Sequence, residues 1–164
     1  MLVAHGNMMR ERGFTLIEAL VVLSIVAIVL AIGAPNLSFL IASMNARSAS
    51  FDLIGDLALA RSEAIKRNGV VTVQPLAGNN WALGWRVVAA STPTFPEMTI
   101  RQREALPATL SVASGSNMLT FQPNGRLGAD DTAKASWAIT SSNATPRCVV
   151  ITPTGAARSK VGAC

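Results

Sequence analysis

The sequence predicts an α+β protein in which one long N-terminal helix packs on an antiparallel β-sheet domain. Three observations predict this fold. Residues 14–35 are apolar, with Glu18 as their only charge, and apolar residues at helical spacing continue through residues 36–68. Within residues 69–164 the pattern changes to short β-type runs separated by Gly, Pro, Ser and Asn. That part leaves no room for βαβ units, which makes its strands antiparallel.

Residues 14–35 are long enough to cross a membrane. At about 1.5 Å per residue, their helix would be roughly 33 Å long, and a bilayer core is about 30 Å thick. Arg10 and Arg12 precede the segment, and the next basic residue is Arg47. The positive-inside rule therefore predicts a single-pass protein with its N-terminus in the cytoplasm and its C-terminal domain outside.

An ordinary secretory signal is an alternative explanation of the same segment. Residues 31–33, Ala-Ile-Gly, offer a weak cleavage site for such a signal. The apolar run is longer than a usual signal core, however, and Glu18 interrupts it. We therefore favour the retained membrane segment.

The second half of the helix is expected to be amphipathic. Pro35 lacks a backbone donor, so it predicts a kink or local break near residues 31–35. The residue pair Asn68-Gly69 predicts the end of the helix. Apolar residues recur at steps of three, four and seven, and they predict the face that packs on the sheet: Met44, Phe51, Ile54, Ala58 and Ile65. Polar residues occupy the other faces, among them Asp52 and Asp56.

Six strands are expected in the β domain. Each is a run rich in β-branched, aromatic or alternating residues, bounded by turn residues. A turn at residues 78–80, Gly-Asn-Asn, separates the first two strands. The expected strands are residues 70–74, 81–88, 98–103, 118–122, 136–140 and 148–152.

The chain offers little of the chemistry of an active site. Its one histidine, His5, lies near the N-terminus, so no Ser–His or Cys–His pair can form in the exported domain. The sequence has no cluster with metal-ligand spacing and no phosphate-binding glycine loop. Asp130 and Asp131 are adjacent and are expected to form a solvated turn rather than a catalytic pair. We therefore expect no enzyme activity, no cofactor and no metal.

The two cysteines, Cys148 and Cys164, predict a disulfide, because an even pair in an exported domain usually pairs. In the chain-entropy description, a loop of this size contributes roughly 3 kcal/mol of stability.

Residues 12–20, Arg-Gly-Phe-Thr-Leu-Ile-Glu-Ala-Leu, resemble the class III signal of type IV pilins and type II secretion pseudopilins. The resemblance implies a pilin-like fold and a leader, residues 1–13, that a prepilin peptidase removes. Cleavage would fall between Gly13 and Phe14, with N-methylation of the new Phe14 amine. The true start could be Met1, Met8 or Met9. The resemblance also implies that Glu18 pairs with the N-terminal amine of a neighbouring subunit.

Three further segments resemble the GspH/FimT group of minor pilins and pseudopilins. They are residues 57–64, the pattern Trp81-x-x-Gly84-Trp85, and the pattern Phe121-x-Pro123-x-Gly125-Arg126. We expect both tryptophans to lie in the core. Gly125 and Gly155 are expected where the backbone needs positive φ or close packing.

Basic residues raise the hypothesis of DNA binding. The last eighteen residues contain Arg147, Arg158 and Lys160 and no acid, and Arg126 is a further candidate. Such cations can bind the phosphates of double-stranded DNA without reading its sequence. The C-terminal part of the chain is similar to a Gly-Arg-x-Arg pattern that DNA-binding members of this group carry. Here the matching residues are 155–158, Gly-Ala-Ala-Arg, so the first arginine is replaced by alanine.

Three functions remain open at this point. The favoured one is a minor type IV pilin, held in the bacterial inner membrane with its C-terminal domain in the periplasm and then incorporated in the pilus. It would help to initiate assembly or form the tip, with DNA binding for natural transformation as an added hypothesis. The first alternative is a minor pseudopilin of a type II secretion system. The second is a membrane-anchored binding domain that never polymerises. In that case, replacing Glu18 by valine would leave its function intact.

Overall fold

The computed structural model describes residues 13–92, 96–131 and 135–164, and at residues 34–36 it describes the backbone alone. Apart from Gly13, the expected leader and its alternative starts Met1, Met8 and Met9 lie outside the described residues. The chain forms two compact units, one ending at Leu37 and the other comprising Ser38–Cys164. Each unit is described by itself below.

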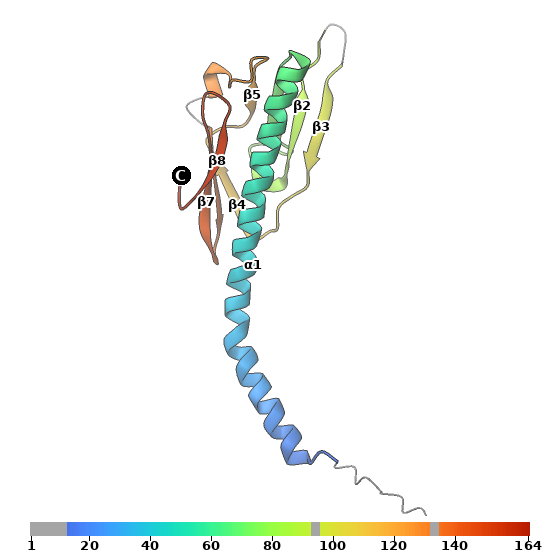
Figure 1. The fold of residues 1–164 in the computed structure, drawn as a ribbon, viewed down its shortest axis with the longest axis vertical. Coiled ribbons are helices and arrows are strands. Elements are labelled where there is room, and N and C mark those ends of the chain that lie inside the picture. The colour runs from blue at the N-terminus through green and yellow to red at the C-terminus, as the bar shows by residue number, and fades with distance from the viewer. Residues whose placement is uncertain (1–12, 93–95, 132–134) are drawn as a thin grey trace, which may run out of the picture. The chain divides into compact units, whose positions relative to one another are not determined.

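A single helix, α1 (Leu16–Arg67, 52 residues), belongs to both units (Figure 1). It is continuous through residues 31–35, and the kink expected at Pro35 stays a prediction. Its end is the one predicted. Asn68 has a positive φ of 49°. The Asn68 N–H donates to the Ile65 carbonyl at 3.2 Å and the Gly69 N–H to the Ala64 carbonyl at 3.1 Å, which is the Schellman arrangement.

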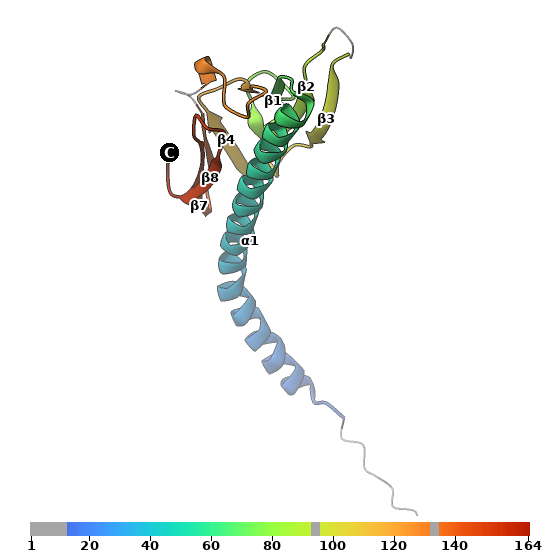
Figure 2. The same ribbon diagram turned by 45° about the horizontal axis from the view of Figure 1, so that its top comes forward.

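In its described residues, the larger unit adds two antiparallel sheets of four strands each. The first has the order β3-β2-β1-β5 and the second the order β4-β6-β7-β8. In both views, β2 and β3 lie to one side of the soluble half of α1, and β7 and β8 lie to the other (Figures 1 and 2). The strands are β1 (Val71–Pro75), β2 (Trp85–Ala89), β3 (Met98–Arg103), β4 (Leu110–Ser114), β5 (Leu119–Phe121), β6 (Ser136–Ser141), β7 (Ala144–Ile151) and β8 (Ala157–Val161).

The strand prediction needs two corrections. The strands β4 and β8 were not expected, because their residues are mostly small or polar and carry a weak β signal. Residues 81–88 do not form one strand. Their first three residues make the 3₁₀ turn η1 (Trp81–Leu83), closed by Gly84 at a φ of 98°. A side chain at position 84 would meet the Arg103 carbonyl, so glycine is required there.

The helix face that packs on the sheets is mostly not the predicted one, although Ile54 of that face is half-buried and packs against the core. Met44 is 62 % exposed and Phe51 is 53 % exposed. The buried face is instead made mostly of small residues: Ala42, Ala46, Ala49, Leu53, Leu57, Ala60 and Ala64. Small side chains let two sheets approach one helix closely. Leu53 and Leu57 are the large side chains of this buried face, whereas Met44, Phe51 and Ile65 point outward.

The two sheets share one core, in which the tryptophans are central. The rings of Trp81 and Trp137 pack edge to face at 5.3 Å between centroids, so the turn η1 contacts β6 directly. The Trp81 indole N–H donates to the Ser116 carbonyl at 3.0 Å. Trp81 and Trp85 are both buried, which confirms the sequence prediction for these two residues.

Candidate functional site

The predicted processing and assembly residues lie at the start of α1. Gly13 and Phe14 are exposed and precede the helix, which begins at Leu16. The Thr15 hydroxyl accepts a hydrogen bond from the Glu18 N–H at 3.3 Å, so Thr15 caps the helix. Glu18 is exposed and lies in the first helical turn, where the helix dipole favours a negative charge. Sequence reasoning missed this cap, although the Thr-x-x-Glu spacing is its ordinary signal.

The helix that follows exposes its apolar side chains on every side. Every Leu, Ile and Val between residues 16 and 32 is exposed. An 18-residue window of α1 reaches a mean hydropathy of 2.8, so by length and composition the helix could cross a membrane. A segment that is apolar all round needs an apolar environment, either lipid or other helices.

A buried carboxylate in the larger unit joins α1 to the first sheet. The Asp56 side chain is 0 % exposed. It accepts hydrogen bonds from the Trp85 indole at 2.9 Å, from Arg101 at 3.1 Å and from the Nε of Arg103 at 2.9 Å. Arg103 also pairs with Asp52 at 3.3 Å, one helical turn away. These contacts attach β3, an edge strand, to the helix.

Electrostatics favour the charged form of Arg103 in this arrangement. The hydrogen bond to Asp56 raises the pKa of the Arg103 guanidinium, and the charges of Asp56 and Asp52 act in the same direction against the effect of burial. A raised pKa contributes stability that is fully present below the ordinary pKa of an arginine and is lost only as the pH rises past the raised value. Sequence reasoning placed Asp56 on a polar face of the helix, away from the sheet, and missed the cluster.

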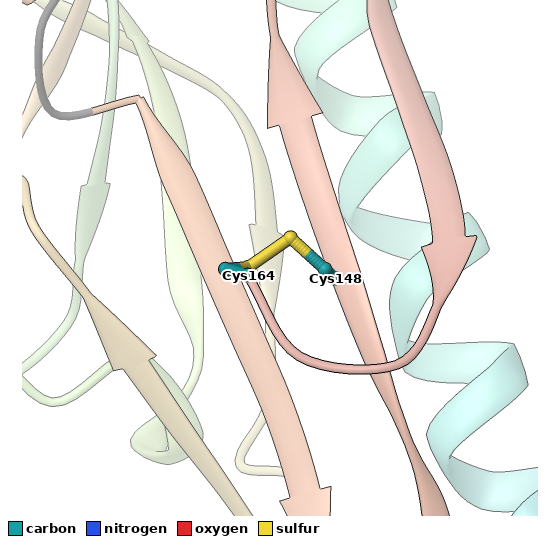
Figure 3. Close-up of a disulfide and its surroundings, with 2 residues drawn as sticks. All are labelled: Cys148 and Cys164. Carbon is teal, nitrogen blue, oxygen red and sulfur yellow. A yellow bond between two sulfur atoms is a disulfide. The ribbon is translucent and has the colours of Figure 1, made fainter.

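The predicted disulfide is present and ties the end of the chain to β7. Cys148 and Cys164 are bonded, with their Cα atoms 5.1 Å apart. Figure 3 shows the segment after β8 crossing the strand that carries Cys148. In the strand register, Cys148 lies opposite Ala138 on β6 and opposite Lys160 on β8. The next residue, Val149, belongs to the core cluster, whereas Cys148 does not. The bond therefore lies on the outer face of the second sheet.

The candidate DNA-binding residues do not all share one face. Arg158 and Lys160 are exposed and lie two residues apart on β8, on the same outer face as the disulfide. Arg147 is half-buried and is paired with Ile139 and Val161, so it lies on the opposite face.

Arg126 is exposed in the loop that follows β5. The next residue, Leu127, donates its N–H to the Pro153 carbonyl at 3.1 Å, which places this loop beside the turn before β8. Gly125 and Gly155 have positive φ values of 73° and 81°. A Cβ on Gly155 would clash with the Gly125 carbonyl oxygen, so both expectations for these glycines hold.

The structure brings together no metal-binding group in the part of the chain that it describes. No three His, Cys, Asp or Glu side chains gather among those residues. The features that stand out are the capped start of an exposed apolar helix, the buried Asp56 cluster and the basic outer face of β8.

Comparisons with known proteins agree with the fold and with the motif at the start of α1. The family described as "Type II transport protein GspH" matches residues 49–155, and the "Prokaryotic N-terminal methylation motif" matches residues 8–34. Crystal structures of the type IV minor pilin FimU of Pseudomonas aeruginosa are similar in fold. One has 26 % identity and a TM-score of 0.57, covering 70 % of this chain and 86 % of that chain. Another has 25 % identity and a TM-score of 0.54, covering 70 % and 90 %. The comparison with curated proteins found no match.

Proposed function

Because the chain belongs to the GspH family and has a type IV pilin-like fold, we propose that it is a minor subunit of a type IV pilus. A prepilin peptidase cleaves it between Gly13 and Phe14 and methylates the new Phe14 amine. The apolar half of α1 then holds the chain in the inner membrane, with its N-terminus in the cytoplasm and the larger unit in the periplasm. From there the chain enters the pilus, at or near its tip, and helps to initiate assembly.

One observation carries this proposal: the exposed apolar helix begins with a single carboxylate, Glu18, in a stretch that matches the methylation motif. In a filament, apolar helices of other subunits would surround Glu18. An unpaired carboxylate is costly there, and a neighbour's N-terminal amine would offset much of that cost. The pairing would thus align neighbouring subunits along the filament and would offset the cost of the Glu18 charge.

Replacing Glu18 by valine tests this role. We expect Glu18→Val to be cleaved normally, since the bond between Gly13 and Phe14 is untouched, and to remain in the membrane without entering filaments. Immunoblots of the sheared filament fraction and of the membrane fraction measure both steps. Glu18→Asp serves as a matched control that keeps the charge, and we expect it to retain part of the incorporation. If Glu18→Val enters filaments at the wild-type level, the non-polymerising anchor is the better explanation.

A minor pseudopilin of a type II secretion system is the second candidate. The description of the matching family favours it, whereas the similarity to a minor pilin structure favours the pilus. The pattern of the last strands, with a terminal disulfide and a basic edge, leads us to prefer the pilus. A deletion strain scored for surface pili and for release of exoproteins separates the two functions, because each system loses only its own product.

DNA binding is an added role that the outer face of β8 favours. Arg158 and Lys160 form a pair of exposed cations on that face, and Arg126 is exposed in a loop that lies beside the turn before β8. We propose that they contact phosphates of double-stranded DNA during uptake. The binding would be independent of sequence and sensitive to salt.

Removing both cations should weaken DNA binding and flatten its salt dependence. For Arg158→Ala with Lys160→Ala, we expect the slope of log K against log salt to fall by about 1.8, from about 0.9 per lost phosphate contact. Mobility-shift titrations at several salt concentrations measure the slope. The control is Arg147→Ala, on the opposite face of the sheet, which should change it less. An unchanged slope in the double variant would exclude this site.

A further inference from the structure

The side chain of Arg61 lies where α1 meets two turns of the larger unit. One turn contains Gly125, after β5, and the other contains Gly155, before β8. The Arg61 Nε lies 3.3 Å from the position that a Cβ would take on either glycine. Any larger residue at these two positions would therefore crowd the arginine. The two glycines leave room for the Arg61 side chain beside both turns.

Arg61 has no anionic partner among the residues that the structure describes. It is half-buried and makes no hydrogen bond or ion pair with any of them. The acids of this half of α1 bind other cations, since Asp52 and Asp56 pair with arginines of β3. Glu63 pairs with the two cations in the last turn of the helix. Burial removes part of the water that solvates a guanidinium, and an anion usually offsets this cost. The position of Arg61 therefore favours an anionic ligand.

The backbone of the two turns does not bind such a ligand by itself. The Gly125 N–H donates to the Gln122 carbonyl at 2.8 Å. The Gly155 N–H donates to the Thr152 carbonyl, also at 2.8 Å. Because these donors are used within the turns, a ligand there would be held by side-chain charge. Contacts of that kind bind the phosphates of a nucleic acid without reading its sequence.

Three further cations belong to these turns or to the strand that follows them. Arg126 is exposed in the first turn. Arg158 and Lys160 are exposed on β8, which begins two residues after Gly155. In the described part of the chain, none of the three has an acidic partner. Together with Arg61 they are more cations than a single carboxylate would need, and they suit a ligand with repeated negative charges.

We propose that Arg61 binds a backbone phosphate of double-stranded DNA. The DNA site then extends from the outer face of β8 over the two glycine turns to α1. The proposal rests on the DNA-binding role proposed above, and it adds a contact from the helix, where the sequence gave no candidate. Arg61 would thus be a contact residue, and the two glycines would keep its guanidinium accessible to the phosphate.

Salt titrations of DNA binding test this contact. Arg61→Met keeps an unbranched side chain over the glycines and removes the charge. We expect the slope of log K against log salt to fall by about 0.9 in this variant. Between about 50 and about 200 mM salt, its affinity should therefore drop about 3.5-fold less than that of the wild type. Arg61→Lys keeps the charge and should retain the wild-type slope. Fluorescence anisotropy of a labelled duplex, titrated with the full chain in detergent, measures the slopes.

Arg47→Met is the matched control. It removes the same charge from the same helix 14 residues earlier, which is about 21 Å along the axis. Charge effects over that distance are screened at ordinary salt concentrations, so its slope should equal that of the wild type. A weaker affinity of Arg61→Met with an unchanged slope would show that Arg61 only positions the turns. That result, or an unchanged affinity and slope, would overturn the proposal.

Chemical labelling of the wild-type chain gives a readout that does not depend on the folding of a variant. Phenylglyoxal modifies accessible arginine side chains, and mass spectrometry measures each site. Bound DNA should protect Arg61 and leave Arg47 reactive, and no protection of Arg61 would overturn the proposal. A wild-type chain that binds no DNA at low salt would refute the DNA-binding role itself. If the wild type binds and only Arg158→Ala with Lys160→Ala lowers the slope, the Arg61 contact alone is refuted.

Discussion

Replacing both Arg101 and Arg103 by methionine should lower the free energy of unfolding by about 3 kcal/mol, because it leaves a buried carboxylate without its cations. Asp56 has no exposed side-chain surface and would keep only the Trp85 indole as a partner. The two arginines are themselves partly exposed, so we take the lower end of the range for broken buried pairs. A domain of this size is stable by about 5–15 kcal/mol, so the loss is a large fraction of the total.

Denaturant unfolding of the full chain in detergent, followed by tryptophan fluorescence, measures this loss. Adding Asp56→Asn to the double variant should restore part of the stability, since a neutral amide is less costly to bury than a carboxylate. The control Arg86→Met removes a cation from β2 that has no contact with Asp56 and should cost little. A loss below about 1 kcal/mol in the double variant would show that water replaces the arginines and that the cluster is not structurally important.

Replacing Cys148 and Cys164 together by alanine should cost about 3 kcal/mol, because the bond restricts the unfolded chain over a separation of 16 residues. For a domain of this size that corresponds to a fall in Tm of about 10 °C. Alanine is chosen because position 148 is fully buried and a hydroxyl there would add a desolvation cost.

Two further measurements separate the bond from other effects of this substitution. A reductant should lower the Tm of the wild-type chain to the same value and leave the alanine variant unchanged. Limited proteolysis should then cut near β8, whose outer edge has no neighbouring strand in the order of its sheet. Equal Tm values for the oxidised wild type and the variant would contradict the expectation.

The sequence predicted the fold class, the end of the helix and the disulfide, because each depends on a local or compositional signal. The residue pair Asn68-Gly69 is a local signal for a helix end, and two cysteines leave one possible pairing. The strands β4 and β8 carried no comparable signal. Leu110–Ser114 and Ala157–Val161 are strands because their neighbours in the sheet hold them there.

The packing face of α1 was predicted wrongly for a physical reason. Hydrophobic periodicity selected the face of Met44, Phe51 and Ile65, and these three side chains are exposed. The true contact face is rich in alanine, which adds little to such a pattern. Only the requirement that two sheets fit around one helix selects it, and that requirement is not visible in a linear sequence.

Part of the candidate site could have been predicted and was not. Asp52 and Asp56 lie one turn apart on the same face of the helix. Arg101 and Arg103 lie two residues apart, so their side chains share one face of the strand. Which strand would face the helix was the missing information. Conversely, Gly13, Phe14 and Glu18 came from a motif alone, and their roles remain predictions.

The alanine-rich face of α1 also bears on how such subunits can diverge. At Ala46, Ala60 and Ala64, which have no exposed surface, added methylenes would cost about 1–3 kcal/mol by overpacking. Sequence drift there is limited by side-chain volume and preserves the fold. On the outer face the same helix can accept new side chains without disturbing its own core. The buried face of the helix can thus stay unchanged and hold the same domain, while its outward residues change to match a new neighbour. Related subunits could in this way acquire different positions in an assembly.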